Sequence, residues 1–299
     1  MDVVVPFRGE PAALERVRAR LAVLPLRPGD SIVVVDNTPG PARAPSDGAV
    51  RVIQASEVPT PAFARNRGAA EGNAEWLVFI DADTSPSADL LDRYFDPPPA
   101  DRTGLLGGGV LDEPVATGGG AAARYQYLRG AMSQEDTYRQ VRWGYPKTAN
   151  AACRRVAFEA VGGFREDIRA AEDGDLAFRL RAAGWDVERR DGATVLHTSR
   201  PTARAFVVQK LLHGAGGAWL DREYPGSYPP RGLRGLFWWG LRATTSELLA
   251  AAWERDRDLA IWALFDSLDL IMWELGRSLP NERPVPRDSR WRRVLERVE

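Results

Sequence analysis

The sequence predicts an α/β fold in which a mainly parallel sheet is flanked by helices and followed by a helical C-terminal extension. Three observations support this prediction. Short β-branched runs alternate with helical patterns in the first half of the 299-residue chain, acidic residues follow several of these runs, and the pattern beyond residue 200 is helical alone. Strands that alternate with helices of about ten residues are typical of βαβ units. We therefore expect an α/β domain over residues 1–200 and a helical extension over residues 201–299.

The expected strands cover residues 3–5, 32–35, 52–53 and 77–80, and the expected helices between them cover residues 11–24 and 61–71. In sheets of this kind, ligands bind beyond the carboxyl ends of the parallel strands. Pro6, Asp36, Asp81 and Asp83 all fall at such ends. A glycine-rich stretch, residues 102–123, then predicts a strand and a mobile loop near the same crevice, although it equally suits simple turns and linkers.

A proline-rich break precedes two expected long helices, residues 233–253 and 258–276. Apolar residues at helical spacing give the second helix one hydrophobic face. Its opposite, polar face contains Trp262 and Trp273, and Trp238-Trp239 lie on the helix before it. Exposed tryptophans here would contact a bilayer interface, a lipid-linked acceptor or another subunit, whereas buried ones would pack against the first domain.

Composition excludes several classes of protein. The hydrophobic content of 44% is ample for a packed core, and a net charge of −1 gives no basic field that would hold a nucleic acid backbone. The single cysteine, Cys153, cannot form an intrachain disulfide, which suits a reducing cytoplasm. The sequence shows neither a signal-peptide pattern nor 18 consecutive uncharged apolar residues, so we expect a protein that is not secreted by that route and does not span a membrane.

Two acidic clusters and a histidine have the residue types that metal-assisted chemistry requires. Asp81-Ala-Asp83 follows an apolar strand, and a carboxylate pair with the imidazole of His197 suits a divalent cation that carries a diphosphate. The alternative is that the aspartates cap the strand and the next helix, and that His197 bonds to backbone. Glu172-Asp173 opens an amphipathic helix, where acids either complement the helix dipole or provide a general base.

These motifs, taken in order, resemble the inverting glycosyltransferases of family 2, which have the GT-A fold. The resemblance covers roughly residues 2–200 of this chain. Its motifs are Val3-Val-Val-Pro6, Ile32-Val-Val-Val-Asp36-Asn37, Ala64-Arg65-Asn66-Arg67-Gly68, Asp81-Ala-Asp83, Asn150-Ala-Ala-Cys-Arg-Arg155 with Val161-Gly-Gly-Phe164, and Glu172-Asp173. The resemblance implies a glycosyltransferase that uses a nucleotide-diphosphate sugar as donor and Mg²⁺ or Mn²⁺ as cofactor.

The resemblance also implies a role for each matching residue. The expected nucleotide-sugar contacts are Pro6, Phe7, Asp36, Arg65, Asn66 and Asp81. The expected metal ligands are Asp83, Asp81 and His197, and the expected catalytic residues are Asp173 as general base and Glu172 as the group that orients the acceptor. A plain structural role stays open for Asp36, which suits a turn before Asn37. We also expect one of Arg65 and Arg67 to face solvent.

The segment from Trp143 to Asn150 precedes the acceptor-side motif and offers aromatic faces, a lysine and an amide. We expect Trp143, Lys147 and Asn150 to contact the acceptor, although aromatic and amide side chains also pack loops.

Two departures from the family pattern narrow the expected reaction. The common Tyr-Asn pair is missing after the first strand, where this chain has Pro6-Phe7-Arg8-Gly9, so base contacts there are unassigned. No Gln-x-x-Arg-Trp follows the Glu-Asp motif, since Gln209 leads into Lys210-Leu-Leu-His213, and this favours a single, non-processive transfer. The acceptor is either lipid-linked or a small glycoside, and we expect no nucleic acid partner.

Three rival functions share parts of this pattern. A retaining GT-A glycosyltransferase would have the same fold and metal motif, and a sugar-phosphate nucleotidyltransferase would release pyrophosphate. A non-catalytic scaffold would act through the C-terminal helices, which otherwise predict a membrane-surface contact or a homodimer. The expected location is the cytoplasm, either free or peripheral at the inner face of the membrane.

Overall fold

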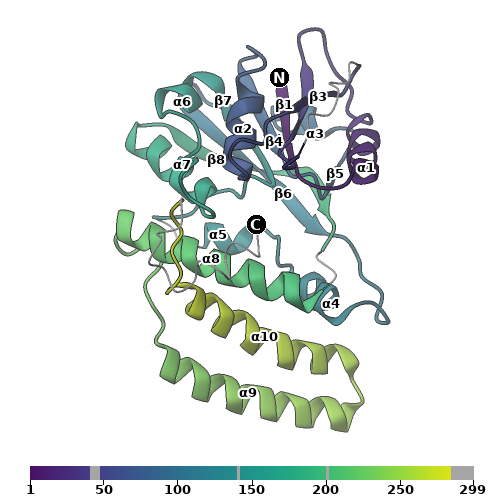
Figure 1. Ribbon diagram of the computed structural model, residues 1–299, viewed down its shortest axis with the longest axis vertical. Coiled ribbons are helices and arrows are strands. Elements are labelled where there is room, and N and C mark those ends of the chain that lie inside the picture. The colour runs from purple at the N-terminus through teal and green to yellow at the C-terminus, as the bar shows by residue number, and fades with distance from the viewer. Residues whose placement is uncertain (41–47, 140–141, 200–201, 284–299) are drawn as a thin grey trace. The chain divides into compact units, whose positions relative to one another are not determined.

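The computed structural model describes residues 1–40, 48–139, 142–199 and 202–283, which form two compact units (Figure 1). The sheet unit comprises Met1–Leu111, Ser133–Glu166 and Glu172–Thr198. The helical unit comprises Asp112–Met132, Asp167–Ala171 and the described residues from Ser199 onward. The helical unit therefore includes two earlier segments that the predicted division at residue 200 did not assign to it.

The sheet unit is built on one eight-stranded sheet with the order β3-β2-β1-β4-β7-β6-β8-β5. The strands are β1 (Asp2–Phe7), β2 (Ser31–Asp36), β3 (Arg51–Gln54), β4 (Trp76–Ile80), β5 (Thr84–Pro86), β6 (Thr103–Asp112), β7 (Asn150–Arg154) and β8 (Asp186–His197). β1 pairs in parallel with β2 and β4, and β2 pairs in parallel with β3. β7 is antiparallel to β4 and β6, and β5 is antiparallel to β8.

The predicted α/β class is confirmed, and the parallel part of the sheet is the part in which strands and helices alternate in the sequence. The antiparallel part was not predicted, because it follows the glycine-rich stretch and lacks that alternation. Gly107 to Gly109 lie within β6 and not in a mobile loop. A Cβ atom at Gly108 would stand 2.3 Å from Nδ2 of Asn150, so the glycine is required by close packing of β6 against its neighbours.

Helices of both units follow local sequence signals. Those of the sheet unit are α1 (Pro11–Leu21), α2 (Pro61–Ala69), α3 (Leu90–Arg93), α5 (Glu135–Tyr138), α6 (Arg155–Ala160) and α7 (Glu172–Ala182). Those of the helical unit are α4 (Ala121–Arg129), α8 (Ala203–Glu223), α9 (Leu233–Glu254) and α10 (Arg257–Gly276). At the start of α2, Pro61 occupies the first turn and Thr60 caps the helix by accepting a hydrogen bond from the Phe63 N–H, which fixes where α2 begins over the sheet.

The core of the sheet unit depends on a close approach of α2 to β1 and β2. The valines of β1 and β2 are buried, and Gly68 of α2 faces two of them. A Cβ atom at Gly68 would lie 2.4 Å from Cγ1 of Val4 and 2.9 Å from Cγ2 of Val35. Only glycine lets the helix pack at this distance, and the packing sets the position of the other α2 side chains.

Replacing Gly68 by Ala is therefore expected to lower the free energy of unfolding by about 1–3 kcal/mol, since the methyl group would push α2 off the sheet. Urea unfolding followed by circular dichroism measures the change. A Cβ atom at Gly235 of α9 would have no atom within 4 Å, so Gly235→Ala is the matched control and should leave stability unchanged or raise it. Equal stability of Gly68→Ala and the natural chain would contradict this packing.

The helical unit is organised around α10, which packs against α4, α8 and α9. Its core contains Tyr125 of α4, Phe206 of α8, and Ile261 and Phe265 of α10. The expected polar face of α10 is also covered, because Trp262 packs half-buried on Tyr125 with ring centroids 5.7 Å apart.

The carboxylates of that face are paired inside the same unit. Asp269 forms an ion pair with Lys210 at 2.7 Å, and Oδ1 of Asp258 accepts a hydrogen bond from Nε of Arg124 at 2.9 Å. The half-buried Trp273 lies beside Gly217 and the guanidinium of Arg277. Of the two alternatives for the tryptophans of α10, burial is the one observed, and the partners are helices of the same unit, since α10 has neighbours on three sides.

Within the ranges that the structure describes, no helix combines the length and the hydrophobicity needed to cross a bilayer.

Candidate functional site

The predicted convergence of strand ends is present in the sheet unit. Phe7 at the end of β1 lies opposite Asp36 at the end of β2 in the parallel register. Asp81 directly follows β4, which is the other neighbour of β1, and its N–H donates to the carbonyl of Ala149 at 3.3 Å. Because the three strands run in parallel, the side chains that follow them share one edge of the sheet.

Arg65 links the first acidic motif to the second. It reaches from α2 and is almost fully buried, with 4% of its side chain exposed. Its guanidinium forms ion pairs with Oδ1 of Asp81 at 2.6 Å and with Oε1 of Glu172 at 2.8 Å. Burial alone would lower the pKa of Arg65, but the charges of the two carboxylates outweigh it and the pKa is raised. Arg65 is therefore a fixed cation, whereas Arg67 on the same helix is exposed.

Asp83 and His197 meet because β5 pairs with β8. The antiparallel register places Thr84 opposite His197, and the N–H of Thr198 donates to the carbonyl of Asp83 at 2.9 Å. Nε2 of His197 lies 3.6 Å from Oδ2 of Asp83. His197 is buried, whereas Asp83 is half-buried with 44% of its side chain exposed.

These two atoms are close enough to become neighbouring ligands of one cation after a small movement. Ligand atoms at about 2.1 Å from a divalent ion lie about 3.0 Å apart when adjacent, so the observed 3.6 Å would have to shorten by about 0.6 Å. In the described part of the chain, no group of three or more His, Cys, Asp or Glu side chains is arranged around a common point. Mg²⁺ is commonly held by one or two protein side chains together with substrate phosphates and water, so a two-residue site suits a cation that arrives with a diphosphate.

Asp173 has the environment of a base that titrates near neutral pH. It lies in the first turn of α7, half-buried, and Oδ1 accepts a hydrogen bond from the Gly174 N–H at 2.8 Å. Loss of solvent and the charge of Glu172 raise the pKa of Asp173 to about 7, although that hydrogen bond and the positive charges of Arg65 and Lys147 oppose the increase. A carboxylate with this pKa can accept a proton from a hydroxyl near neutral pH.

The third acid of the motif, Asp175, has a structural role. It is buried and accepts hydrogen bonds from Arg179 one helical turn later, at 2.8 Å from Nε. Arg179 in turn donates to the carbonyl of Val161 at 2.7 Å. This pair holds α7 to the preceding segment and leaves Glu172 and Asp173 at the start of the helix.

Asn66 holds the turn that the family pattern places on the acceptor side. Its Nδ2 donates to the Phe164 carbonyl at 2.8 Å and to Oε1 of Glu166 at 2.7 Å, and its Oδ1 accepts from the Phe164 N–H at 2.9 Å. Gly163 approaches the same amide closely and has a φ of +70°, which favours glycine. The observed contacts of Asn66 are thus with protein.

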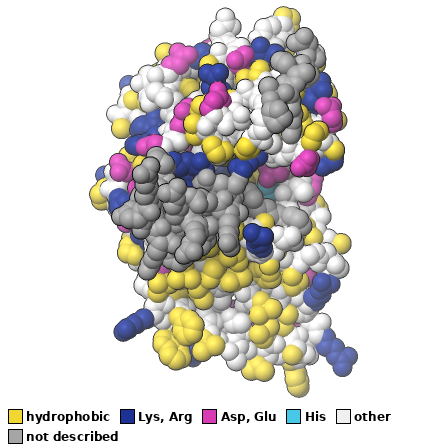
Figure 2. All heavy atoms as spheres, in the orientation of Figure 1, with side chains coloured by type: hydrophobic (Ala, Val, Ile, Leu, Met, Phe, Trp, Pro, Cys, Tyr) yellow, Lys and Arg dark blue, Asp and Glu magenta, His cyan; other side chains and the backbone are white. Residues whose placement is uncertain are grey.

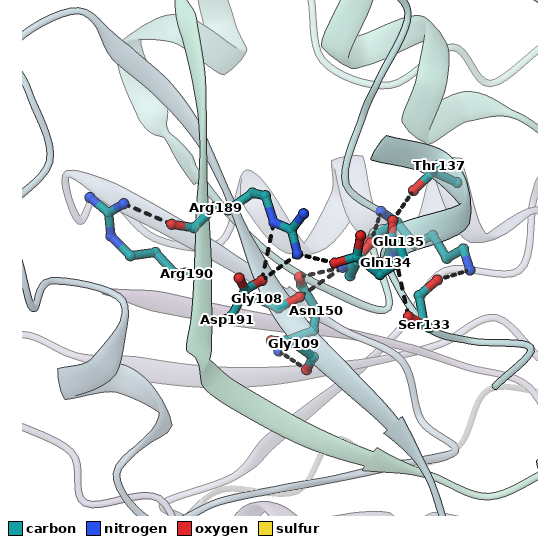
Figure 3. Close-up of polar contacts among 11 residues, drawn as sticks. Gly108, Gly109, Ser133, Gln134, Glu135, Thr137, Asn150, Arg189, Arg190 and Asp191 are labelled. Atoms are coloured by element: carbon teal, nitrogen blue, oxygen red, sulfur yellow. Dashed lines mark hydrogen bonds and ion pairs between the residues drawn. The ribbon is translucent and has the colours of Figure 1, made fainter. Parts of the chain in front are cut away.

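Asn150 is fully buried in the sheet (Figure 3). Its Nδ2 donates to the carbonyls of Gly109 at 2.9 Å and Ala193 at 2.7 Å, and its Oδ1 accepts from the hydroxyl of Tyr94 at 2.6 Å. The side chain joins β6, β7 and β8 at one point, which is a structural task that the sequence did not reveal.

Gln134 completes this network by donating to the carbonyl of Gly108 at 2.9 Å (Figure 3). The side-chain oxygen of Gln134 also accepts from the N–H of Lys147 at 2.7 Å. The ammonium of Lys147 donates to the carbonyl of Ser133 at 2.6 Å. Trp143 is half-buried against Phe178 of α7, with ring centroids 5.0 Å apart. The segment from Trp143 to Lys147 thus packs beside α7, and its acceptor contacts stay a prediction.

The remaining donor-side residues are enclosed. Asp36 is 1% exposed, and its Oδ1 accepts from the Thr38 N–H at 3.0 Å, which is the turn-forming bond expected of an aspartate there. Phe7 is buried and Pro6 is half-buried. One further contact escaped the sequence analysis: Arg20 of α1 donates to the carbonyl of Ala82 at 3.0 Å and so fixes the backbone between the two aspartates.

Comparison with known proteins agrees with the motifs. Residues 76–265, from β4 into α10, match the family described as "Glycosyl transferase family group 2". The pre-mycofactocin glycosyltransferase of Mycobacterium tuberculosis is 29% identical over 247 residues, which is 79% of this chain and 50% of that protein. Glycosyltransferase AglE of Haloferax volcanii is 28% identical over 161 residues, which is 53% of this chain and 52% of that protein. The chain thus spans about half the length of the curated relatives it matches.

The solved structures support the fold. The mannosyltransferase PcManGT from Pyrobaculum calidifontis, determined in complex with GDP-Man and Mn²⁺, superposes with a TM-score of 0.61. The alignment covers 92% of this chain and 86% of that protein at 17% sequence identity. Since the family match spans well over half of the chain and contains Asp81, Asp83, Glu172, Asp173 and His197, the chain belongs to glycosyl transferase family group 2 and has the GT-A fold.

Proposed function

We propose that this chain is a metal-dependent, inverting glycosyltransferase that moves one sugar from a nucleotide-diphosphate sugar to an acceptor hydroxyl. The observation that carries the proposal is the buried Arg65, which binds Asp81 of the cation motif and Glu172 of the base motif at once. The two acidic motifs are thereby held as one site within the sheet unit. Family membership and the GDP-Man and Mn²⁺ complex of PcManGT support a sugar-nucleotide donor and a divalent cation.

Asp83 and His197 would hold Mg²⁺ or Mn²⁺, with Asp81 beside them. A bound cation neutralises the negative charge that grows on the departing diphosphate. The buried position of His197 places its Nε2 3.6 Å from Oδ2 of Asp83, so the two side chains would contribute one nitrogen and one carboxylate oxygen to the cation. Asp36, Pro6, Phe7, Arg65 and Asn66 would form or support the donor side.

Asp173 would accept the proton of the acceptor hydroxyl as that hydroxyl attacks the anomeric carbon. Inversion requires attack from the side opposite the departing diphosphate, so the base must lie apart from the cation. Arg65 forms ion pairs with both Asp81 and Glu172, so Asp173, the residue after Glu172, would lie across Arg65 from the cation motif. Glu172 is held by Arg65 and would orient the acceptor, with Trp143 and Lys147 close to α7 on the same side.

The missing Gln-x-x-Arg-Trp motif supports a single, non-processive transfer, and the acceptor would be a lipid-linked glycoside or a small free one. We place the reaction in the cytoplasm. The only cysteine, Cys153, is a buried free thiol, which suits a reducing compartment.

Thermal unfolding with a panel of nucleotide sugars, each with and without Mn²⁺, tests the donor and metal assignments. A donor present at about 100 times its dissociation constant is expected to stabilise the fold by roughly 2.7 kcal/mol, and the stabilisation should require Mn²⁺. The Asp83→Asn variant should lose the part of this stabilisation that depends on Mn²⁺. Asp101→Asn, which replaces an exposed aspartate remote from both motifs, is the control and should retain it.

Product analysis separates the rivals. Release of a nucleoside diphosphate and an inverted anomeric configuration by NMR are the expected results. Pyrophosphate release would show a nucleotidyltransferase, and a retained configuration would show a retaining enzyme. If no nucleotide sugar changed the melting temperature, the donor-site assignment would be wrong.

A further inference from the structure

Helix α9 presents an apolar face that the other described residues of the helical unit leave uncovered. Trp238 is 65% exposed, Leu249 69% and Trp253 91%. Figure 2 shows hydrophobic side chains gathered over α9 in the lower part of the view. The exposed large apolar side chains of α9 are Leu233, Phe237, Trp238, Trp239, Leu241, Leu249 and Trp253. A contiguous apolar surface of this kind marks a contact site.

Five exposed residues form a single line along α9. Trp238, Arg242, Thr245, Leu249 and Trp253 follow the spacing i, i+4, i+7, i+11 and i+15, and all five are exposed. Leu233 and Phe237 are exposed as well, but they lie about 160° and about 120° around the helix from this line. We call this line and its neighbours Arg234, Trp239 and Leu241 the outer face of α9.

The opposite side of α9 carries small residues that pack on α10. Gly240 and Ala251 are buried, and a Cβ atom at Gly240 would meet Oγ of Ser267 at 3.3 Å. The hydroxyl of Thr244 lies 2.8 Å from that of Ser267 and is hydrogen-bonded to it. The large side chains of α9 are therefore not the ones that attach the helix to its unit.

The charges of the outer face are all positive. Arg234 and Arg242 are exposed within it. The two acids of α9, Glu247 and Glu254, are about 140–160° around the helix from the centre of this face, taking 3.6 residues per turn. Apolar and aromatic side chains combined with arginines and no acid are typical of helices that lie in the interface of an anionic bilayer.

We propose that the outer face of α9 binds the surface of an anionic lipid bilayer. The helix has 22 residues and so extends about 33 Å in the plane of the surface. Trp238 and Trp239 near its start and Trp253 at its end would enter the interface at both ends. Arg234 and Arg242 would reach headgroup phosphates, since long side chains can keep their charge at the aqueous boundary.

Charge favours a bilayer over a second copy of this chain. A symmetric dimer through the outer face would bring Arg234 and Arg242 of both copies into one contact. No acidic side chain on that face would neutralise their positive charges. An anionic lipid surface supplies the missing negative charge. The inference does not depend on the sugar transfer proposed above, because lipid binding is measured without donor or acceptor.

Vesicle sedimentation with the full chain tests the proposal. Vesicles of phosphatidylcholine with about 30% phosphatidylglycerol should bind the protein, and vesicles of phosphatidylcholine alone should bind it much less. The double variant Arg234→Gln/Arg242→Gln should lower partitioning to the anionic vesicles about 30-fold, because a basic side chain near such a surface contributes about 1 kcal/mol. The triple variant Trp238→Ser/Leu249→Ser/Trp253→Ser should lower it at least tenfold on both compositions.

A matched control keeps the outcome decisive. Val23→Ser/Val156→Ser removes two exposed apolar side chains of the sheet unit, at 51% and 56% exposure, and should bind vesicles like the natural chain. All variants change exposed residues, so their melting temperatures should stay within a few degrees and exclude unfolding as the cause. Failure of the natural chain to bind anionic vesicles, or equal loss in the control, would overturn the proposal. A concentration-dependent dimer that the triple variant abolishes, without vesicle binding, would assign the face to a second copy and also overturn it.

Discussion

Replacing Asp173 by Asn is expected to lower kcat by about 10²- to 10⁴-fold, because the acceptor hydroxyl would lose the carboxylate that takes its proton. The amide retains the shape of the side chain, and its oxygen can still accept the hydrogen bond from the Gly174 N–H. Donor binding should therefore change little. Steady-state kinetics combined with donor titration followed by thermal shift separates the two quantities.

The pH dependence of the natural enzyme gives a second readout of the same residue. With the pKa of Asp173 in the free protein raised to about 7, kcat/KM should fall tenfold per pH unit below that value and level off above it. The charged groups that bear on Asp173 are Glu172, Arg65 and Lys147. A profile that is flat between pH 6 and 8 would show that another group accepts the proton.

The raised pKa of Asp173 also makes the free energy of unfolding depend on pH. Stability should fall as the pH rises, whereas activity should increase. A carboxyl group whose folded pKa exceeds its unfolded value contributes stability when protonated, and that stability is lost as pH rises towards about 7. Asp173→Asn should therefore be more stable than the natural chain at pH 8. Asp175→Asn is the contrasting control: it breaks the buried ion pair with Arg179, so it should lose stability and keep measurable turnover per folded molecule.

Local signals in the sequence predicted the parallel half of the fold and the position of its strand ends. These signals are local: each spans only a few residues, so the structure that it forms can be predicted from a short segment. They are the β-branched strands, the Thr60-Pro61 helix start and the two acidic motifs. The resemblance to family 2 glycosyltransferases is confirmed by the family match over residues 76–265. The division into domains and the roles of single site residues stay predictions.

Contacts between distant segments account for what the sequence could not show. Arg65 and Arg67 look alike along α2, and only the fold reveals that Arg65 meets Glu172, 107 residues away. A strand and simple turns were both open for the stretch around Gly108, because the amide of Asn150 that occupies the space beside this glycine lies 42 positions later. The sequence left exposure and burial of Trp262 both open, because it does not show that α4 covers that side of α10.

Replacing Arg65 by Met should reduce the free energy of unfolding by about 3 kcal/mol, since Asp81 and Glu172 would lose the cation that forms ion pairs with both of them. We take the lower end of the range for buried pairs because 29% of the Asp81 side chain is exposed. Arg65→Lys should recover only part of the loss, because an ammonium group cannot bond to two separate carboxylates in the manner of the guanidinium fork. Arg67→Met, the exposed neighbour, is the control and should be neutral.

The activity of the Arg65 variants distinguishes a positioning role from general destabilisation. The positive charge of Arg65 lowers the pKa of Asp173, so its removal in Arg65→Met should move the acid limb of the kcat/KM profile to higher pH. A double-mutant cycle with Glu172→Gln, measured by urea unfolding, should give a coupling energy above about 0.5 kcal/mol if the ion pair forms in solution. An unchanged pH profile with zero coupling would place Arg65 outside the site. A shifted profile with clear coupling would mean that this single arginine sets both the distance between the cation motif and the base motif and the pH at which the base operates.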